Sequence, residues 1–337
     1  MVQSVRLSLV VILLLSACAS PEADDALYIG SVEVVSPDME DVVDPGARPE
    51  VLSEGYGWSE GPVFVSDEVG VLFSDVRGNT LHRWHPDTGT TAWLNPSGYT
   101  GEEERGGGLG SNGLTLDNAG QLVLAQHGDR RIARLESGWA SPAPDFATIV
   151  DRFDGKRFNS PNDVVQGPDG GWYFTDPTYG LASPDLAELD FAGLFRVSGD
   201  GEVTVLDSTL TRPNGLAFSP DGGTLYVGNS DPARAIWMAY DIENGAVTSS
   251  RVFYDATAHV AEDMPGLPDG LKVDTDGRIW ATGPGGVWVF TPDGEHLGTV
   301  RTDVQTANLA FGPDGTLYLT SHMYFARIPT QVTGMGF

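Results

Sequence analysis

Residues 157–164 have the sequence Arg157-Phe158-Asn159-Ser160-Pro161-Asn162-Asp163-Val164, and residues 169–177 continue Asp169-Gly170-Gly171-Trp172-Tyr173-Phe174-Thr175-Asp176-Pro177. The first part is a polar loop that carries two amides and a carboxylate around a proline and leads into a short apolar strand. The second part is an Asp-Gly turn and another short strand. Turn residues between two short β-type runs predict a hairpin. Weaker copies of this unit recur through the chain.

Six copies of the turn and its following strand can be aligned. They occupy residues 67–75, 117–124, 169–176, 221–227, 276–281 and 314–319. Another short strand follows each copy, at 81–84, 132–135, 194–197, 236–240, 287–290 and 326–328. A period of about forty to fifty residues with four short strands per unit is typical of a β-propeller blade. The sequence therefore predicts an all-β fold, a six-bladed β-propeller.

The ends of the repeat array suggest how the ring closes. The last unit ends soon after its third strand, so we expect its fourth strand to come from the N-terminal segment near residues 31–43. The rest of residues 18–48 is acidic and contains proline, which is typical of a tether. We expect the propeller itself to span residues 49–337.

The N-terminus has the layout of an export signal. An apolar run, Leu7 to Leu15, is too short to span a bilayer and leads into Leu15-Ser16-Ala17-Cys18. This tetrapeptide is similar to the bacterial lipobox, so residues 1–17 are predicted to be a lipoprotein signal peptide and Cys18 the lipidated N-terminus. Ala19 favours the outer membrane, on its periplasmic side or at the cell surface. A plain signal peptide cleaved near Ala17 or Ala19 is the alternative.

The bulk composition excludes some partners. The formal net charge is −28, from 47 acidic and 19 basic residues. Nucleic-acid binding needs clustered Lys and Arg, and none are clustered here. Cys18 is the single cysteine, so no disulfide can form within the chain. We expect a monomer that acts on a small molecule and meets a membrane only through the lipid anchor.

Polar residues precede the innermost strand of every predicted blade. In a propeller these positions face the central channel, and all six hold an acidic residue or an asparagine: Glu60, Asn112, Asn162, Asn214, Asp269 and Asn308. The oxygens of Glu60, Asn162, Asn214 and Asp269 would form an all-oxygen metal site that suits Ca²⁺, with other divalent cations possible. A zinc site of the usual N/S type is disfavoured. Asn-Gly and Asp-Gly also form turns, so the argument depends on all six positions being filled together.

Five short blocks resemble the signature blocks of the gluconolactonase/regucalcin family, which are six-bladed propellers close in architecture to diisopropyl-fluorophosphatase. The blocks are Glu60-Gly61-Pro62, Asn159-Ser160-Pro161-Asn162-Asp163, Phe174-Thr175-Asp176-Pro177, Pro213-Asn214-Gly215-Leu216 and Pro268-Asp269-Gly270-Leu271. The resemblance spans residues 51–328. It implies a lactone substrate and Ca²⁺ on Glu60, Asn214 and Asp269, with Asn162 as a fourth ligand or a substrate contact. Ser160 stands where regucalcin-like members carry a substrate-contacting arginine, so the resemblance does not extend to that contact.

These observations favour a calcium-dependent hydrolase that opens a sugar lactone. In this hypothesis the metal polarises the carbonyl and a carboxylate activates water. Asp269 is the first candidate for the base and Asp163 the second, while direct attack by Asp269 as a nucleophile stays open. A phosphotriesterase-type hydrolase on the same site and a non-catalytic surface-binding propeller lipoprotein are the alternatives.

Further polar residues are candidates for substrate contacts. Asn112, Asn159, Asn162 and His322 are predicted to bind the substrate. His322 matches a channel-lining histidine of the phosphatase, and His127 occupies the corresponding place in the second unit. Packing is the alternative role for both histidines. Asp176 is expected to hold its own loop.

Overall fold

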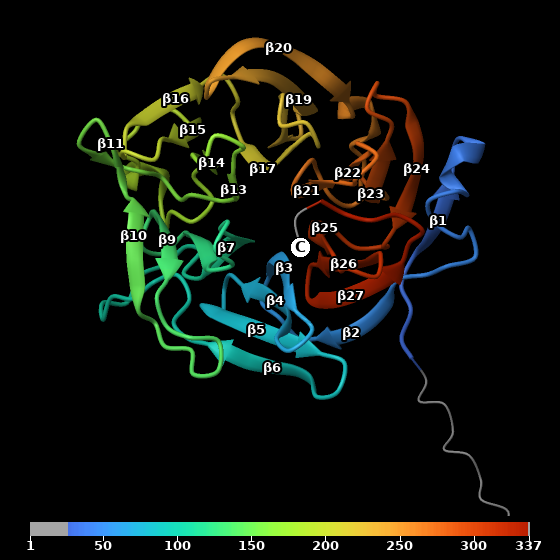
Figure 1. The fold of residues 1–337 in the computed structure, drawn as a ribbon, viewed down its shortest axis with the longest axis horizontal. Coiled ribbons are helices and arrows are strands. Elements are labelled where there is room, and N and C mark those ends of the chain that lie inside the picture. Colours follow the sequence, from blue (N-terminus) through green and yellow to red (C-terminus); the bar gives the residue numbers. More distant parts are fainter. Residues whose placement is uncertain (1–25, 336–337) are drawn as a thin grey trace, which may run out of the picture.

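The described part of the chain, residues 26–335, forms a ring of six antiparallel β-sheets around a central channel in this computed structural model (Figure 1). Within these residues the only helical elements are three short 3-10 turns, η1 (Pro37–Met39), η2 (Pro184–Leu186) and η3 (Thr257–His259). The prediction of an all-β, six-bladed propeller is therefore confirmed. Between residues 26 and 335, no helix has both the length and the apolar character needed to cross a bilayer.

Each blade begins beside the channel and adds its strands outward (Figure 1). Blades one to three consist of β3 (Ser59–Ser66), β4 (Gly70–Asp75), β5 (Thr80–His85), β6 (Gly89–Leu94); β7 (Ser111–Leu116), β8 (Leu122–Gln126), β9 (Arg131–Leu135), β10 (Phe146–Val150); and β13 (Val164–Gln166), β14 (Trp172–Asp176), β15 (Gly193–Val197), β16 (Val203–Asp207). A small hairpin, β11 (Arg152–Phe153) and β12 (Lys156–Arg157), lies between blades two and three in the chain.

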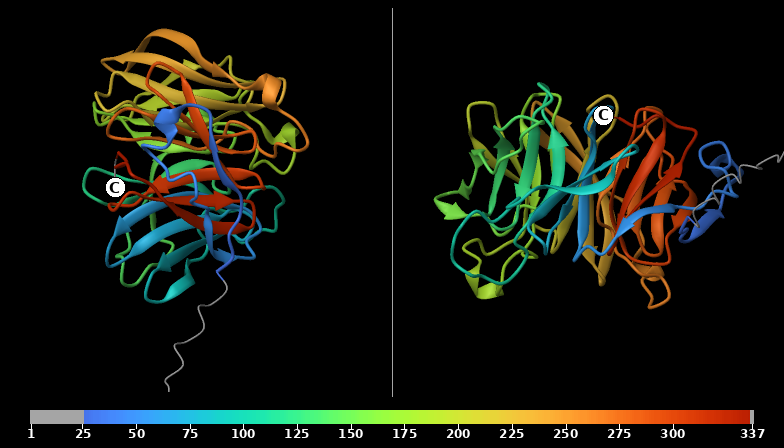
Figure 2. Two further views of the ribbon diagram at one scale, coloured as in Figure 1. Left: turned by 90° about the vertical axis from the view of Figure 1, so that its right-hand side faces the viewer. Right: turned by 90° about the horizontal axis from the view of Figure 1, so that it is seen from below.

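The second half of the ring repeats the same order. Blades four to six consist of β17 (Pro213–Phe218), β18 (Thr224–Asp231), β19 (Arg234–Glu243), β20 (Ala246–Asp255); β21 (Leu271–Val273), β22 (Ile279–Gly283), β23 (Gly286–Phe290), β24 (His296–Arg301); and β25 (Thr306–Phe311), β26 (Thr316–Ser321), β27 (Tyr324–Pro329). Side views show the sheets standing next to one another around the channel (Figure 2).

An N-terminal strand closes the ring, but not from the predicted segment. The outer strand of blade six is β2 (Glu50–Glu54), which pairs with β27. Residues 31–43 were the predicted source, and this prediction was wrong. Their strand, β1 (Ser31–Val34), pairs with β24 and forms a fifth strand on blade five. Within β2, Leu52 packs against an apolar cluster that includes Tyr318 and Phe325 of blade six.

Part of the predicted tether is packed against the propeller. Met39, Val42 and Val43 are buried in one apolar cluster with residues of blades five and six. The guanidinium of Arg301 on β24 also forms an ion pair with the carboxylate of Glu33 on β1. The prediction that residues 18–48 are a tether is therefore wrong from Ser31 onward. Cys18 and the predicted signal peptide lie outside the described residues.

Apolar side chains between neighbouring blades form the core. Alternate residues of a strand face opposite sides of its sheet, so each blade presents one apolar face to each neighbour. For example, Leu72 and Leu81 of blade one pack with Leu114 and Leu124 of blade two. Trp280 and Trp288 are fully buried in blade five. Burial of each large side chain contributes about 1.5–3 kcal/mol to the stability of the fold. The packed blades therefore form a rigid wall around the channel.

The repeated aspartates hold the turns that the sequence repeat identifies. The side chain of Asp117 accepts hydrogen bonds from the backbone N–H groups of Ala119 and Gln121, both at 2.8 Å. Asp169, Asp221 and Asp314 make equivalent contacts in their own blades. In blade five the capping residue is Asp274, which accepts from the N–H groups of residues 276 and 278. These aspartates are structural and do not contribute to the channel.

Candidate active site

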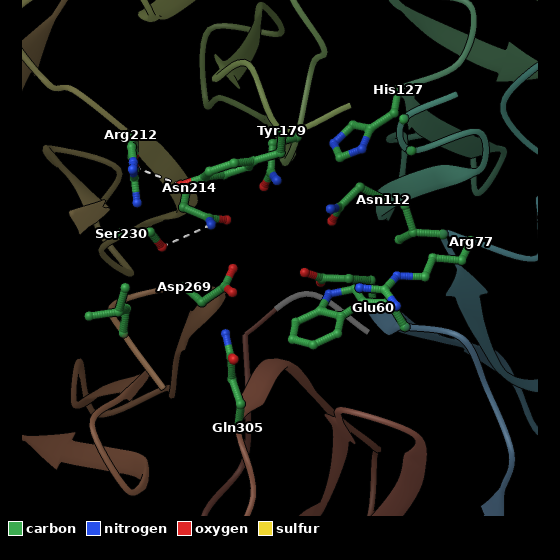
Figure 3. Close-up of a pocket in the computed structure, with 16 residues that line it drawn as sticks. Glu60, Arg77, Asn112, His127, Tyr179, Arg212, Asn214, Ser230, Asp269 and Gln305 are labelled. Carbon is green, nitrogen blue, oxygen red and sulfur yellow. Dashed lines mark hydrogen bonds between the residues drawn. The ribbon is translucent and has the colours of Figure 1, made fainter. Parts of the chain in front are cut away.

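The channel-facing residues meet in a pocket at one mouth of the ring. Glu60 and Asn112 lie at the starts of β3 and β7, Asn214 lies at the start of β17, and Asn162 and Asp269 lie just before β13 and β21. All five line a pocket with a volume of about 460 Å³. Their polar ends point toward one common space, as Figure 3 shows for four of them. The side chains are almost completely buried, from 2% exposed for Glu60 to 7% for Asp269.

Several oxygens in this pocket have no hydrogen-bond partner in the protein. They are Oδ1 of Asn112, Asn162, Asn214 and Asp269. A buried polar atom without a partner costs about 1–3 kcal/mol, so four together indicate that the pocket is built for a ligand. The amide of Asn214 is oriented by its other end, because Nδ2 donates to Ser230 Oγ at 3.1 Å and leaves Oδ1 facing the pocket.

Hydrogen bonds between blades fix the backbone beneath these side chains. The N–H of Gly113 donates to the carbonyl of Asn162 at 2.7 Å, and the N–H of Gly215 donates to the carbonyl of Asp269 at 3.2 Å. The hydroxyl of Thr175 donates to the carbonyl of Asn214 at 2.7 Å. Each contact joins one blade to the next. The polar side chains are therefore carried by a continuous belt around the channel and are held before any ligand arrives.

Asn308 does not occupy the position predicted for it: Ala307 does, since its carbonyl accepts from the N–H of Gly270 as those of the belt residues accept in other blades. Asn308 is the next residue, and with Asp163 of blade three it closes the channel axis. Asn308 Nδ2 donates to Asp163 Oδ2 at 3.5 Å across the ring. The other four blades carry glycine at this position, and the space requires it. A Cβ on Gly113 would lie 2.2 Å from Asp163 Oδ1, and a Cβ on Gly270 would lie 2.1 Å from Asn308 Cγ. The Asp163–Asn308 pair thus fills the axis next to the pocket.

Burial and the crowding of negative charge raise the pKa values of the two carboxylates that line the pocket. Burial raises the pKa of Glu60 to about 7, and the nearby charge of Asp163 raises it further. Burial also raises the pKa of Asp269 well above its usual value, as do the charges of Glu60 and Asp163. A divalent cation would relieve this repulsion. Within residues 26–335, no three His, Cys, Asp or Glu side chains gather as a metal cluster, so amide oxygens would have to complete the site.

The available donors fit a hard cation. Glu60 and Asp269 supply negative charge, and the unpartnered amide oxygens of Asn162 and Asn214 supply neutral oxygen ligands. Oxygen-only coordination by carboxylates, amides and water is the chemistry that Ca²⁺ prefers. The residues that line the pocket therefore fit the predicted calcium ion.

Comparison with known proteins identifies the family. The family model for the SMP-30/Gluconolactonase/LRE-like region matches residues 58–323. A gluconolactonase from Zymomonas mobilis is 35% identical over 329 residues, which are 95% of this chain and 91% of that protein. The chain belongs to the SMP-30/gluconolactonase family. The predicted resemblance is confirmed.

Other members of the SMP-30/gluconolactonase family match over most of their length. A pentonolactonase from Haloferax volcanii is 34% identical over 271 residues, covering 78% of this chain and 80% of that protein. A solved gluconolactonase structure from Xanthomonas campestris is 28% identical, with a TM-score of 0.77, and covers 93% of this chain and all of that one. The similarity of the Xanthomonas structure therefore extends over nearly the whole of this chain.

The sequence-predicted base Asp163 does not line the pocket of this family member. Its carboxylate contacts Asn308 and the N–H of Val164. Burial raises its pKa, while the charge of Lys272 opposes that rise. Asp269 does line the pocket and has a free carboxylate oxygen. The geometry therefore favours Asp269 over Asp163 as the group that contacts a substrate or water.

Asn159 and Ser160 hold a loop outside the pocket lining. The N–H groups of both residues donate to the carboxylate of Asp176 at 2.7 Å. Ser160 Oγ donates to the carbonyl of Pro177, and the N–H of Gly180 donates back to that hydroxyl. Asp176 therefore anchors the loop, as predicted. Asn159, a predicted substrate contact, is fully buried beside this anchor.

The two candidate histidines occupy different environments. His322 lies in the turn between β26 and β27, where it is exposed and packs edge-on against Trp58 with a centroid distance of 5.6 Å. It does not line the pocket, although Trp58 does. His127 lines the pocket directly and is buried. Of the two, only His127 is placed to touch a ligand in the pocket as it stands.

Several residues of the lining had no motif in the sequence. They are Trp58, Arg77, Tyr179, Arg212 and Gln305. Trp58 and Arg212 lie two residues before Glu60 and Asn214, so their proximity to the belt was a usable signal. Arg77, Tyr179 and Gln305 come from connecting loops, and only the folded ring brings them to the pocket (Figure 3).

Proposed function

We propose that this chain is a calcium-dependent lactonase that opens the ring of a sugar lactone. The observation that carries the proposal is the convergence of two buried carboxylates and three unpartnered amide oxygens in the pocket of an SMP-30/gluconolactonase family member. Relatives named as a gluconolactonase and a pentonolactonase support the substrate class. They favour a lactone over a phosphotriester, and the intact pocket disfavours a purely binding propeller.

The roles of the residues follow from their places in the pocket. Glu60, Asn162, Asn214 and Asp269 would hold the cation. A bound divalent cation supplies Lewis-acid polarisation of the lactone carbonyl. The carboxylate of Asp269 lines the pocket with an oxygen that has no partner in the protein, and it would accept a proton from the attacking water. The water oxygen bonds to the carbonyl carbon, the ring C–O bond breaks, and the departing ring oxygen takes up a proton. Asn112, whose Oδ1 has no partner in the protein, is placed to accept a hydrogen bond from the substrate.

The proposal predicts metal-restored turnover. Protein without residues 1–18, stripped with a chelator, should open D-glucono-1,5-lactone only after Ca²⁺ is added, with kcat/KM rising at least about 10²-fold as the electrostatic stabilisation is restored. Acid release at constant pH measures the reaction, and a phosphotriester is assayed in parallel. Turnover of the phosphotriester alone would replace the proposed substrate class. A stripped protein that is fully active would remove the metal from the mechanism.

We further propose that the protein is exported and anchored by lipid on Cys18, because Leu15-Ser16-Ala17-Cys18 has the lipobox pattern. In cells fed labelled palmitate, the full chain should carry the label and sediment with membranes. The Cys18→Ser variant should lose nearly all of both signals, since the thiol is the acylation site. A wild-type protein that is soluble and unlabelled would instead support a plain signal peptide.

A further inference from the structure

The imidazole of His127 is the most conspicuous unsatisfied group in the pocket wall. His127 follows β8 directly, and its backbone N–H donates to the carbonyl of Gly110 at 3.2 Å. The side chain is 2% exposed, and neither ring nitrogen has a hydrogen-bond partner. Figure 3 shows the ring pointing into the cavity on the side of Asn112 and away from Asp269. Its nitrogens are therefore available to whatever occupies that side of the pocket.

The ring is uncharged at neutral pH. Burial and, to a smaller extent, the positive charge of Arg105 together lower the pKa of His127 to about 3. A neutral imidazole has one N–H donor and one acceptor nitrogen. His127 therefore offers both functions from one rigid ring, and both are unused by the protein. If the histidine only filled space, its two ring nitrogens would be buried without hydrogen bonds, which costs free energy. A phenylalanine would fill the same space without that cost.

Close backbone contacts hold the ring in this position. A Cβ on Gly108 would lie 3.0 Å from His127 Nδ1, and a Cβ on Gly180 would lie 2.8 Å from His127 Cβ. Two loops therefore approach the ring so closely that only glycine fits. The guanidinium of Arg105 ties this corner together by donating to the carbonyls of Gly128 and Gly180. The imidazole is thus fixed before a ligand binds, which is what a specificity contact requires.

We propose that His127 recognises a hydroxyl group on the substrate ring and thereby selects polyhydroxylated lactones over unsubstituted ones. This inference rests on the proposed lactonase function and deepens it. A hydroxyl can donate to the acceptor nitrogen of the imidazole or accept from its N–H, so either unused nitrogen can pair with a hydroxyl of the sugar ring. The unpartnered Oδ1 of Asn112, which also lines this pocket, can accept from a neighbouring hydroxyl. An alkyl lactone leaves these buried groups unpaired, and such sites reject analogues that lack the hydroxyl.

The test compares two lactones that differ only in their hydroxyl-bearing groups. Wild type, His127→Phe and His127→Gln are assayed with D-glucono-1,5-lactone and with δ-valerolactone. His127→Phe should lower kcat/KM for the sugar lactone by about 10- to 100-fold, and should change kcat/KM for δ-valerolactone by less than about twofold. His127→Gln, which again provides a donor and an acceptor, should recover part of the loss. His85→Phe, on β5 and outside the pocket lining, is the matched histidine control.

A binding measurement separates this inference from the function on which it rests. Glucono-δ-lactam and δ-valerolactam, which are not opened, are titrated into the same variants by calorimetry. His127→Phe should weaken binding of the hydroxylated lactam alone, again by about 10- to 100-fold. Equal losses for both compounds, or no loss with the sugar compounds, would overturn the role of His127 while leaving lactonase activity intact. Wild-type protein that neither opens the lactones nor binds the lactams would overturn both proposals.

Discussion

Replacing Asp269 with alanine is expected to lower kcat/KM for lactone opening by about 10³-fold or more, because a general base alone contributes about 10²- to 10⁴-fold. The same change should abolish the rise in melting temperature that calcium produces. Asp269 is buried in the pocket, and its Oδ1 has no partner in the protein. Acid release at constant pH and thermal unfolding with and without Ca²⁺ measure the two effects.

Two further variants separate the roles of the Asp269 carboxylate. Asp269→Asn retains an oxygen that can face the pocket but loses the basic charge. If this variant keeps the calcium-dependent rise in melting temperature but loses activity, Asp269 acts mainly as a base or nucleophile. If the variant loses both the rise and the activity, Asp269 acts mainly as a metal ligand. Asp163→Asn should cost less activity, since Asp163 lies outside the lining. Asp87→Ala, with a side chain 86% exposed, is the surface control. An Asp269→Ala enzyme within tenfold of wild type would exclude the residue from catalysis.

The fold was accessible from sequence because each blade carries the same local signal. The turn aspartates, such as Asp117 and Asp169, cap their own turns within four residues, so their effect does not depend on the rest of the ring. Ring closure was harder to predict. β1 and β2 are both short N-terminal strands, and only packing decides that Glu50–Glu54 joins β27 while Ser31–Val34 joins β24.

The sequence could predict only those site residues that lie at the starts of the inner strands. Glu60, Asn112, Asn162, Asn214 and Asp269 converge because each opens an inner strand, and the repeat fixes those positions. Asn308 was predicted to be equivalent to them, and Asp163 was the second candidate for the base. In the structure these two residues meet at the axis, because blades three and six alone lack glycine there. Loop residues such as Tyr179 reach the pocket through long-range contacts that no local pattern encodes.

Metal-free protein is expected to become more stable as the pH falls from 8 to about 4.5, by about 3 kcal/mol from Glu60 alone. Burial raises the pKa of Glu60 to about 7, above the usual value of 4.5 that applies when the chain unfolds. Between these two values the folded state binds a proton that the unfolded state does not, so acidification favours folding. This contribution is complete below about pH 4.5 and is lost as the pH rises through 7. Each tenfold change in proton affinity corresponds to about 1.4 kcal/mol.

Chelated Glu60→Gln protein isolates this contribution from the 47 acidic residues of the whole chain, which also repel one another at high pH. It should be more stable than chelated wild type at pH 8, and the two should converge near pH 4.5. Saturating Ca²⁺ should reverse the order at pH 8, because the cation stabilises the ionised carboxylate and a ligand at about 1,000 times its Kd adds about 4.1 kcal/mol. Urea unfolding at each pH gives these free energies. Parallel pH profiles for the two chelated proteins would show that Glu60 is already ionised without metal, and the crowding of carboxylates would then not be what draws a cation to this pocket.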